Sequence, residues 1–290
     1  AGDLTKAEKI KQANLVFSEA SDTVRSAQNA TQKERLIKTL ALELVRAGNV
    51  EKALDTAGSI ESEPIRDWSL RNVANELARQ GNLEQALNIV NLIKSGLIRD
   101  HSLSVIAGEL AVAGKMEQAL DTVWTIQNPY QKQEALTNIA GELVSKGSKK
   151  QATPIFRKAL RTANKIHDVD SKAIALNNIA GRLARAGDIN QANHVFKRAL
   201  NTARASIRDS NMKDNVLSSI AIELAKAGNI KQALNVAISI KNRSTKGQAL
   251  KLISIEFIKT EKIEEALVAA RAVADDRMLR IISTELLQAG

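Results

Sequence analysis

Residues 179–200 read IAGRLARAGDINQANHVFKRAL, and this stretch decides the fold. Its apolar residues recur at spacings of three and four on both sides of Gly187, which is typical of two amphipathic helices joined by a tight turn. Related phrases recur along the chain: VANELARQGNLEQAL at 73–87, IAGELAVAGKMEQAL at 106–120 and IAIELAKAGNIKQAL at 220–234. The sequence therefore predicts a tandem array of helical hairpins.

The residue at the turn gives the period of the array. Counted as place 15 of each repeat, it is Gly48, Gly81, Gly114, Gly147, Gly187, Gly228, Glu261 and Gly290. Successive anchors are 33, 33, 33, 40, 41, 33 and 29 residues apart. Seven extra residues are about two helical turns, so we expect longer second helices in the 40- and 41-residue repeats. The pattern predicts sixteen helices from about Leu4 to Ala289, in one domain over residues 1–290.

The apolar places predict which face of each hairpin is buried. In the first helix they are places 4, 7, 8 and 11, which share one face at 3.6 residues per turn. Place 8 is small, as in Ala180, and place 11 is large, as in Leu183. A small residue lets a neighbouring helix approach, and a large one fills the gap beside it. The predicted fold class is all-α.

This pattern resembles the tetratricopeptide repeat over essentially the whole chain. Residues 179–200 carry the resemblance best, through Ala180, Leu183, Gly187, Ala192, Phe196 and Ala199. It implies a right-handed α-solenoid superhelix of antiparallel helices, with protein–protein interaction as its function. A weaker similarity to pentatricopeptide repeats, seen in ALNIVNLIKSGLIRD at 86–100, implies RNA binding as the alternative.

Several kinds of site are not predicted. The chain has no Cys, and its three histidines, His101, His167 and His194, are far apart in sequence. No Gly-rich phosphate loop or nucleophile motif is present, so we expect a non-enzymatic protein without metal or cofactor. No apolar run reaches the roughly 20 residues of a membrane helix, which favours a soluble protein of unknown compartment. The start at Ala1 fits a processed precursor or a fragment of a longer chain equally well.

The net charge is concentrated at a few places of the repeat. The chain has 42 Lys+Arg and 32 Asp+Glu, a net charge of +10. Places 2, 5, 9, 12 and 13 lie opposite the predicted core face, and the resemblance implies that they line a concave groove. Among these forty positions Glu134 is the one acidic residue. The eleven cations are Arg35, Lys38, Arg46, Arg71, Arg79, Arg185, Lys226, Lys251, Lys259, Arg277 and Arg280.

We therefore predict that a basic groove binds an acidic peptide or protein surface. Trp68 and His101, both at place 2, lie beside Arg71 in this prediction, and Trp and Arg are typical of binding hot spots. The alternatives are a solvated basic face, nucleic-acid binding, and homodimerisation through uncapped ends. A column of Glu at place 10, such as Glu76 and Glu223, predicts structural ion pairs within or between repeats, and the cations three residues later are at a spacing that permits the pairs within a helix.

Overall fold

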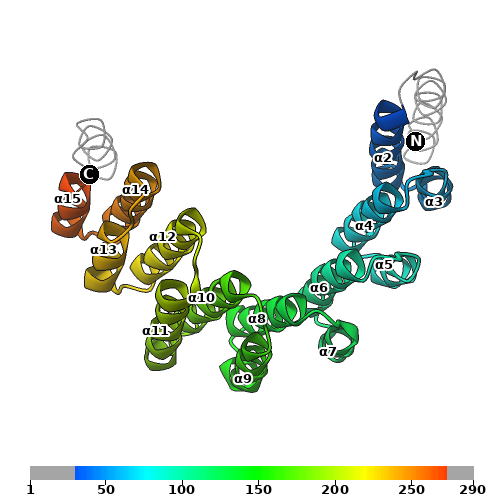
Figure 1. The fold of residues 1–290 in the computed structure, drawn as a ribbon. Coiled ribbons are helices and arrows are strands. Elements are labelled where there is room, and N and C mark those ends of the chain that lie inside the picture. The colour runs from blue at the N-terminus through cyan, green and yellow to red at the C-terminus, as the bar shows by residue number, and fades with distance from the viewer. Residues whose placement is uncertain (1–29, 273–290) are drawn as a thin grey trace, which may run out of the picture. The chain divides into compact units, whose positions relative to one another are not determined.

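The computed structural model describes residues 30–272, in which every regular element is an α-helix (Figure 1). The chain divides into two compact units, Ala1–Ala135 and Leu136–Gly290. We call their described parts, residues 30–135 and 136–272, the N-terminal and C-terminal units. The predicted first and last helices, with Arg277, Arg280 and Gly290, lie outside the described residues. The prediction of one continuous domain stays a prediction.

In the N-terminal unit, three hairpins pack side by side. Each first helix contacts its own second helix, and the three first helices contact one another in chain order (Figure 1). The first helices are α2 (Ala30–Arg46), α4 (Glu63–Arg79) and α6 (Gly96–Val112). The second helices are α3 (Val50–Gly58), α5 (Leu83–Val90) and α7 (Met116–Thr125). Helix α8 (Pro129–Ser145) contains the boundary between the units.

The C-terminal unit repeats this arrangement. Its first helices α10, α12 and α14 contact one another in chain order. The elements are α9 (Lys149–Asn164), α10 (Val169–Arg185), α11 (Ile189–Ser206), α12 (Ser210–Lys226), α13 (Ile230–Ile238), α14 (Arg243–Lys259) and α15 (Ile263–Arg271). Helices α9 and α11 have 16 and 18 residues, whereas α3, α5, α7 and α13 have 8 to 10. The predicted lengthening of the second helices in the 40- and 41-residue repeats is confirmed.

The turn at place 15 has the backbone conformation that the sequence predicts. The six described glycines at this place have φ between 78° and 83°, in the left-handed region that favours glycine. Glu261 occupies the same place with φ 58°, which carries a steric cost for a residue with a side chain. The substitution of glycine by glutamate therefore keeps the turn but strains it.

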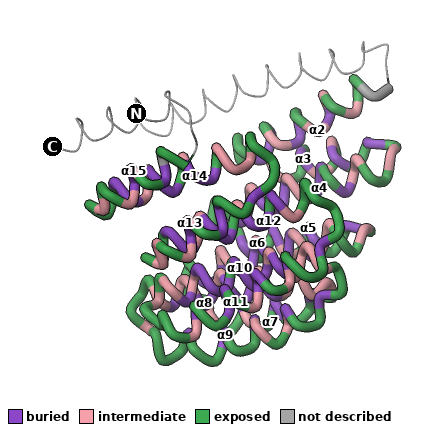
Figure 2. Tube along the Cα trace, turned by 60° about the vertical axis from the view of Figure 1, so that its left-hand side comes forward, coloured by how far each residue is buried: buried purple, intermediate pink, exposed green. Residues whose placement is uncertain are grey.

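The core lies between the helices, and the predicted places 4, 7, 8 and 11 are buried in every described first helix (Figure 2). The structure corrects one part of the prediction, because place 12 is mostly buried as well, as at Val45, Ala78 and Ile258. A first helix packs against neighbours on two sides and against its own second helix. Its buried arc is therefore wider than the four places indicate.

A buried isoleucine precedes each described first helix from α4 onward, α8 included. This isoleucine lies two residues before the residue that caps the helix. Ahead of α8 it lies two residues before Asn128. The six residues are Ile60, Ile93, Ile126, Ile166, Ile207 and Ile240, all at most 4 % exposed. They anchor the loop that joins one hairpin to the next.

Candidate functional site

The predicted binding residues fall into two groups, one in each compact unit. In the N-terminal unit, Arg35, Arg46, Trp68 and Arg79 are exposed, and Lys38, Arg71 and His101 are half-buried. In the C-terminal unit, Arg185, Lys226 and Lys259 are exposed and Lys251 is half-buried. We call each set, which comes from the first helices, the first-helix face of its unit.

Trp68 and Arg71 form the best-defined element of the N-terminal first-helix face. Both come from α4, and the Arg71 guanidinium carbon lies 3.9 Å from the centroid of the Trp68 ring. Trp68 remains 45 % exposed. Burial lowers the pKa of Arg71. The guanidinium nevertheless stays protonated, because the pKa of an arginine lies far above neutral pH. The pair therefore presents an indole face and a cation at one place.

Polar atoms near this pair have unused hydrogen-bonding capacity. Arg71 donates to Asn72 Oδ1 over 3.3 Å, but its Nε is buried without a partner among the described residues. Asn75, one helical turn along α4, is 7 % exposed and its Oδ1 also lacks a described partner. Buried polar atoms are usually hydrogen-bonded, so these two atoms favour a ligand or water at this position.

Glu134, the one acidic residue among the predicted places, lies near His101. Burial raises the pKa of Glu134, and the charge of His101 partly opposes that shift. Burial and the charge of Glu134 together raise the pKa of Tyr130. Glu134 is thus poorly solvated, and it reduces the positive charge on this part of the N-terminal unit.

The glutamates at place 10 pair with four of the predicted cations. Arg46, Arg79 and Lys226 pair with the glutamate three residues earlier, and Arg185 pairs with a glutamate of the next first helix. Arg46 lies 2.7 Å from Glu43 and 3.8 Å from Glu76, which is also 3.6 Å from Arg79. The bond between Arg46 and Glu76 joins α2 to α4. The glutamates at place 10 therefore neutralise part of the positive charge of the N-terminal first-helix face.

The same pairing recurs between α10 and α12. Glu223 accepts from Arg185 over 3.0 Å and from Lys226 over 2.8 Å. Burial alone would raise the pKa of Glu223, but the hydrogen bond and charge of Lys226, with those of Arg185, lower it on balance. Gly181 makes room for this carboxylate, since a Cβ there would overlap Glu223 Oε2. These pairs set the register between neighbouring first helices.

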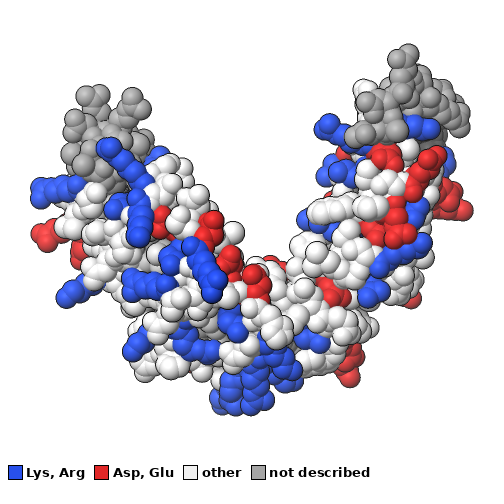
Figure 3. Space-filling view, viewed as in Figure 1, with Lys and Arg blue, Asp and Glu red and all other residues white. Residues whose placement is uncertain are grey.

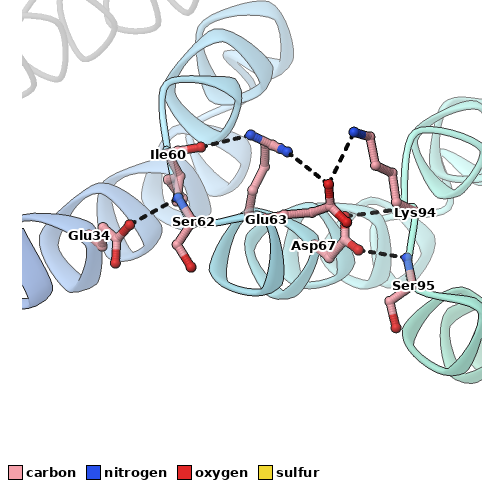
Figure 4. A network of polar contacts seen from close by, with 8 residues as sticks. Glu34, Ile60, Ser62, Glu63, Asp67, Lys94 and Ser95 are labelled. Carbon is pink, nitrogen blue, oxygen red and sulfur yellow. Dashed lines mark hydrogen bonds and ion pairs between the residues drawn. The ribbon is translucent and has the colours of Figure 1, made fainter.

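Three buried carboxylates each join a short hairpin to the next one, and the sequence prediction missed them. Asp67 accepts backbone N–H groups of Lys94 at 3.2 Å and Ser95 at 2.7 Å (Figure 4). Asp100 accepts from Gln127 and Asn128, and Asp214 accepts from Lys241 and Asn242. We call this arrangement the carboxylate clamp.

The clamp follows the length of the repeat. All four described repeats of 33 residues have an acidic residue at place 1: Glu34, which accepts from Ser62, and the three clamp aspartates. The longer repeats have Gln133 and Ala173 there. Their loops are followed by Asp168 and Asp209, which cap α10 and α12 by accepting from Ser171 and Met212. Local caps also occur after short second helices, where Ser95 and Asn242 accept from Ile98 and Thr245. The distant carboxylate is therefore the feature that distinguishes the short second helices from the long ones.

A sequence signal for these loops exists. The tripeptide Ile-x-(Ser, Asn or Asp) recurs at 60–62, 93–95, 126–128, 166–168, 207–209 and 240–242. Together with the acidic residue 28 positions earlier, it identifies the clamp in the short repeats.

Charge is divided unevenly between the units. Residues 30–135 contain 12 Lys+Arg and 14 Asp+Glu, a difference of −2, whereas residues 136–272 contain 24 and 11, a difference of +13. In Figure 3 both charges mix over the helices of the N-terminal unit, and Lys and Arg dominate the C-terminal unit. The +10 of the whole chain therefore comes from its second half, which counting by repeat place does not reveal.

Residues 30–272 contain no group of three or more His, Asp or Glu arranged to hold a metal ion. No helix in the same range combines the length and the apolar content needed to cross a membrane.

Comparison with known proteins gives structural neighbours only. No family model matches the chain, and no curated protein matches it. Ton1535 from Thermococcus onnurineus NA1 has 18 % identity and a TM-score of 0.31, covering 89 % of this chain and 98 % of that one. A Rap protein complexed with competence and sporulation factor has 12 % identity and a TM-score of 0.39, covering 95 % and 99 %. A circular tandem repeat protein has 13 % identity and a TM-score of 0.25, covering 98 % and 76 %.

Proposed function

We propose that this chain is a non-enzymatic scaffold whose N-terminal first-helix face binds an acidic peptide or protein segment. The observation that carries the proposal is the exposed Trp68 ring with the Arg71 guanidinium stacked on it. An aromatic ring beside a cation suits a segment that has an apolar side chain next to a carboxylate. Tryptophan and arginine are the residue types most enriched in binding hot spots.

The surroundings of Arg71 support this choice of partner. Among the described residues no carboxylate lies within ion-pair distance of Arg71, in contrast to Arg46, Arg79, Arg185 and Lys226. A carboxylate of the partner would supply the missing charge, and a carbonyl or amide could satisfy Asn75. A charge-assisted hydrogen bond in a half-buried place is worth about 1.5–3 kcal/mol. We therefore infer that Arg71 is the cation that binds the carboxylate of the partner.

Trp124 offers a matched control for Trp68. It belongs to the same unit, is also 45 % exposed, and has a cation near its ring, Lys132 at 5.8 Å. It lies on second helix α7, away from the first-helix face. A loss of binding that is specific to Trp68 would therefore reflect the place of the ring and not the loss of a surface tryptophan.

The test is the binding of a fluorescein-labelled 12-residue peptide of alternating Glu and Leu, followed by anisotropy. We expect Trp68→Ala and Arg71→Ala each to weaken binding by at least tenfold, and Trp124→Ala by less than threefold. Equal losses in all three variants, or no binding of the acidic peptide by the wild type, would refute the proposal.

Single-stranded RNA is the alternative partner for the first-helix faces. A labelled oligouridine in the same assay distinguishes the two, because phosphate binding falls steeply with salt. RNA bound more tightly than the acidic peptide at 150 mM salt, and lost on Arg71→Ala, would favour the alternative.

A further inference from the structure

The outer surface of the C-terminal unit carries a second concentration of positive charge, separate from the first-helix face. Helices α9 and α11 contain Lys and Arg but no Asp or Glu. Their eight cations are Lys149, Lys150, Arg157, Lys158, Arg161, Lys197, Arg198 and Arg204. The surface over α9 is correspondingly blue in Figure 3.

These cations share one face of each helix. The apolar stripes of α9 and α11, which include Phe156 and Phe196, are buried. Seven of the eight cations are exposed, and Arg198 is half-buried. The C-terminal end of α9 lies against the middle of α11, because Arg198 of α11 donates a hydrogen bond to Asn164, the last residue of α9. The two cationic stripes therefore form one surface, which we call the α9–α11 surface.

The acidic residues nearby are engaged elsewhere. Asp168, Asp188 and Asp209 accept backbone N–H groups as caps of α10, α11 and α12. Asp214 serves the carboxylate clamp and Glu223 pairs with Lys226. The acidic groups that precede α10, α11 and α12 thus hold loops and helix ends. These five carboxylates are thereby committed to backbone N–H groups and to the side chains of Arg185 and Lys226.

The side chains of this surface limit the classes of partner that it can bind. Binding of single-stranded nucleic acid usually needs aromatic rings on which bases stack, and all three phenylalanines of the C-terminal unit are buried. Insertion at a lipid surface needs large apolar side chains on the exposed face, and the only one exposed on α9 or α11 is Ile189. A rigid array of cations without rings or apolar wedges suits regularly spaced phosphates.

We propose that the α9–α11 surface binds the phosphate backbone of double-stranded nucleic acid without reading its sequence. Sixteen residues of helix span about 24 Å. That length matches roughly seven base pairs at 3.4 Å each along one strand. About six phosphate contacts are therefore within reach of the cations.

The experiment measures binding of the full chain to fluorescein-labelled 18-base-pair duplexes of DNA and of RNA. We expect micromolar dissociation constants at 50 mM salt and a loss of about a thousandfold by 200 mM, as six phosphate contacts require. Similar affinity for both duplexes is expected, because the contacts are to the backbone. Tighter binding of the single strand than of either duplex would overturn the proposal.

The decisive variant reverses three exposed cations of the surface: Arg157→Glu, Arg161→Glu and Lys197→Glu together. It should weaken duplex binding by at least tenfold and reduce the slope of log K against log salt by about three. The matched control is Lys33→Glu, Lys94→Glu and Lys115→Glu, exposed lysines of the N-terminal unit that change the net charge equally. Equal weakening by both variants would show diffuse attraction and would overturn the proposal.

Two readouts keep the result clear. Circular dichroism melting confirms that each variant is folded. Vesicles containing 30 % phosphatidylserine test the lipid alternative: binding of vesicles but not of duplexes, lost in the α9–α11 variant, would overturn the nucleic-acid assignment. The acidic-peptide assay should be unaffected by this variant, since the proposed peptide site is in the other unit.

Discussion

Replacing Asp67 by asparagine tests the carboxylate clamp directly. The Asp67 carboxylate is 1 % exposed and accepts two backbone N–H groups, from Lys94 and Ser95. Asparagine keeps the shape but has one oxygen, so its amide N–H₂ would face one of the donors. Hydrogen bonds to charged groups contribute about 1.5–3 kcal/mol each, and burial of the charge offsets part of this. We expect Asp67→Asn to lower the free energy of unfolding by about 2–4 kcal/mol.

The assay is urea unfolding followed by tryptophan fluorescence. Both tryptophans, Trp68 and Trp124, lie in the N-terminal unit, so the signal reports the part of the chain that contains this clamp. With a slope of about 2 kcal/mol/M, the midpoint should fall by roughly 1–2 M. Hydrogen exchange supplies a local readout, because the amides of Lys94 and Ser95 should lose protection in the variant.

Asp55→Asn is the control, since Asp55 is an exposed residue of α3. A surface substitution of this kind is expected to change stability by less than about 0.5 kcal/mol. The reasoning is refuted if Asp67→Asn behaves like Asp55→Asn, or if the amides of Lys94 and Ser95 exchange as slowly as in the wild type.

Three further predictions concern packing, backbone strain and pH. Gly108→Ala should stabilise the chain by up to about 1 kcal/mol, because nothing lies near the added Cβ and alanine favours the helix. Gly181→Ala should give no such gain, because its Cβ displaces Glu223; equal melting shifts would contradict this. Glu261→Gly should relieve the positive φ and raise the melting temperature, and a fall would show that the side chain is needed. Glu223 and Glu134 should respond to pH with opposite signs. The lowered pKa of Glu223 stabilises the fold above the ordinary glutamate value of about 4.3, and this contribution disappears as the pH falls through the folded-state pKa. The raised pKa of Glu134 destabilises the fold at neutral pH, and this cost disappears as the pH falls through the folded-state pKa to below about 4.3. Chemical unfolding at pH 7 should therefore show Glu223→Gln destabilised and Glu134→Gln stabilised, and the same sign for both would contradict these assignments.

The hairpin fold could be predicted because its determinants are local. Gly187 and the apolar spacing around it specify two helices and a turn within 22 residues, and the pattern recurs often enough to exclude chance. The length of α9 and α11 follows from the 40- and 41-residue spacings by the same local logic. The prediction that place 12 lies opposite the core was wrong. A helical wheel assigns one buried face, as for a helix with one neighbour, whereas a first helix packs against three.

The clamp and the charge division could not be read from one repeat. Asp67 accepts from residues 27 and 28 positions later, so its role depends on how the loop after the second helix folds back. The charge of α9 and α11 is on second helices, whereas the prediction followed the first helices. The pairing of Arg46 with Glu76 depends on how far the two side chains reach between α2 and α4. The sequence shows that both residues occur at regular places of the repeat, but it does not show that they meet.

The carboxylate clamp also has a mechanical meaning. The bond from Asp67 to Ser95 closes a loop of the chain across 28 residues, and the clamps at Asp100 and Asp214 close equivalent loops. Under tension on the two ends of the chain, such a loop gains no length until its closing bonds break. The repeat that begins at Ala173 has no side-chain acceptor at place 1 and should lengthen at lower force. The hairpin that bears α11 would then extend before the hairpins that a clamp closes.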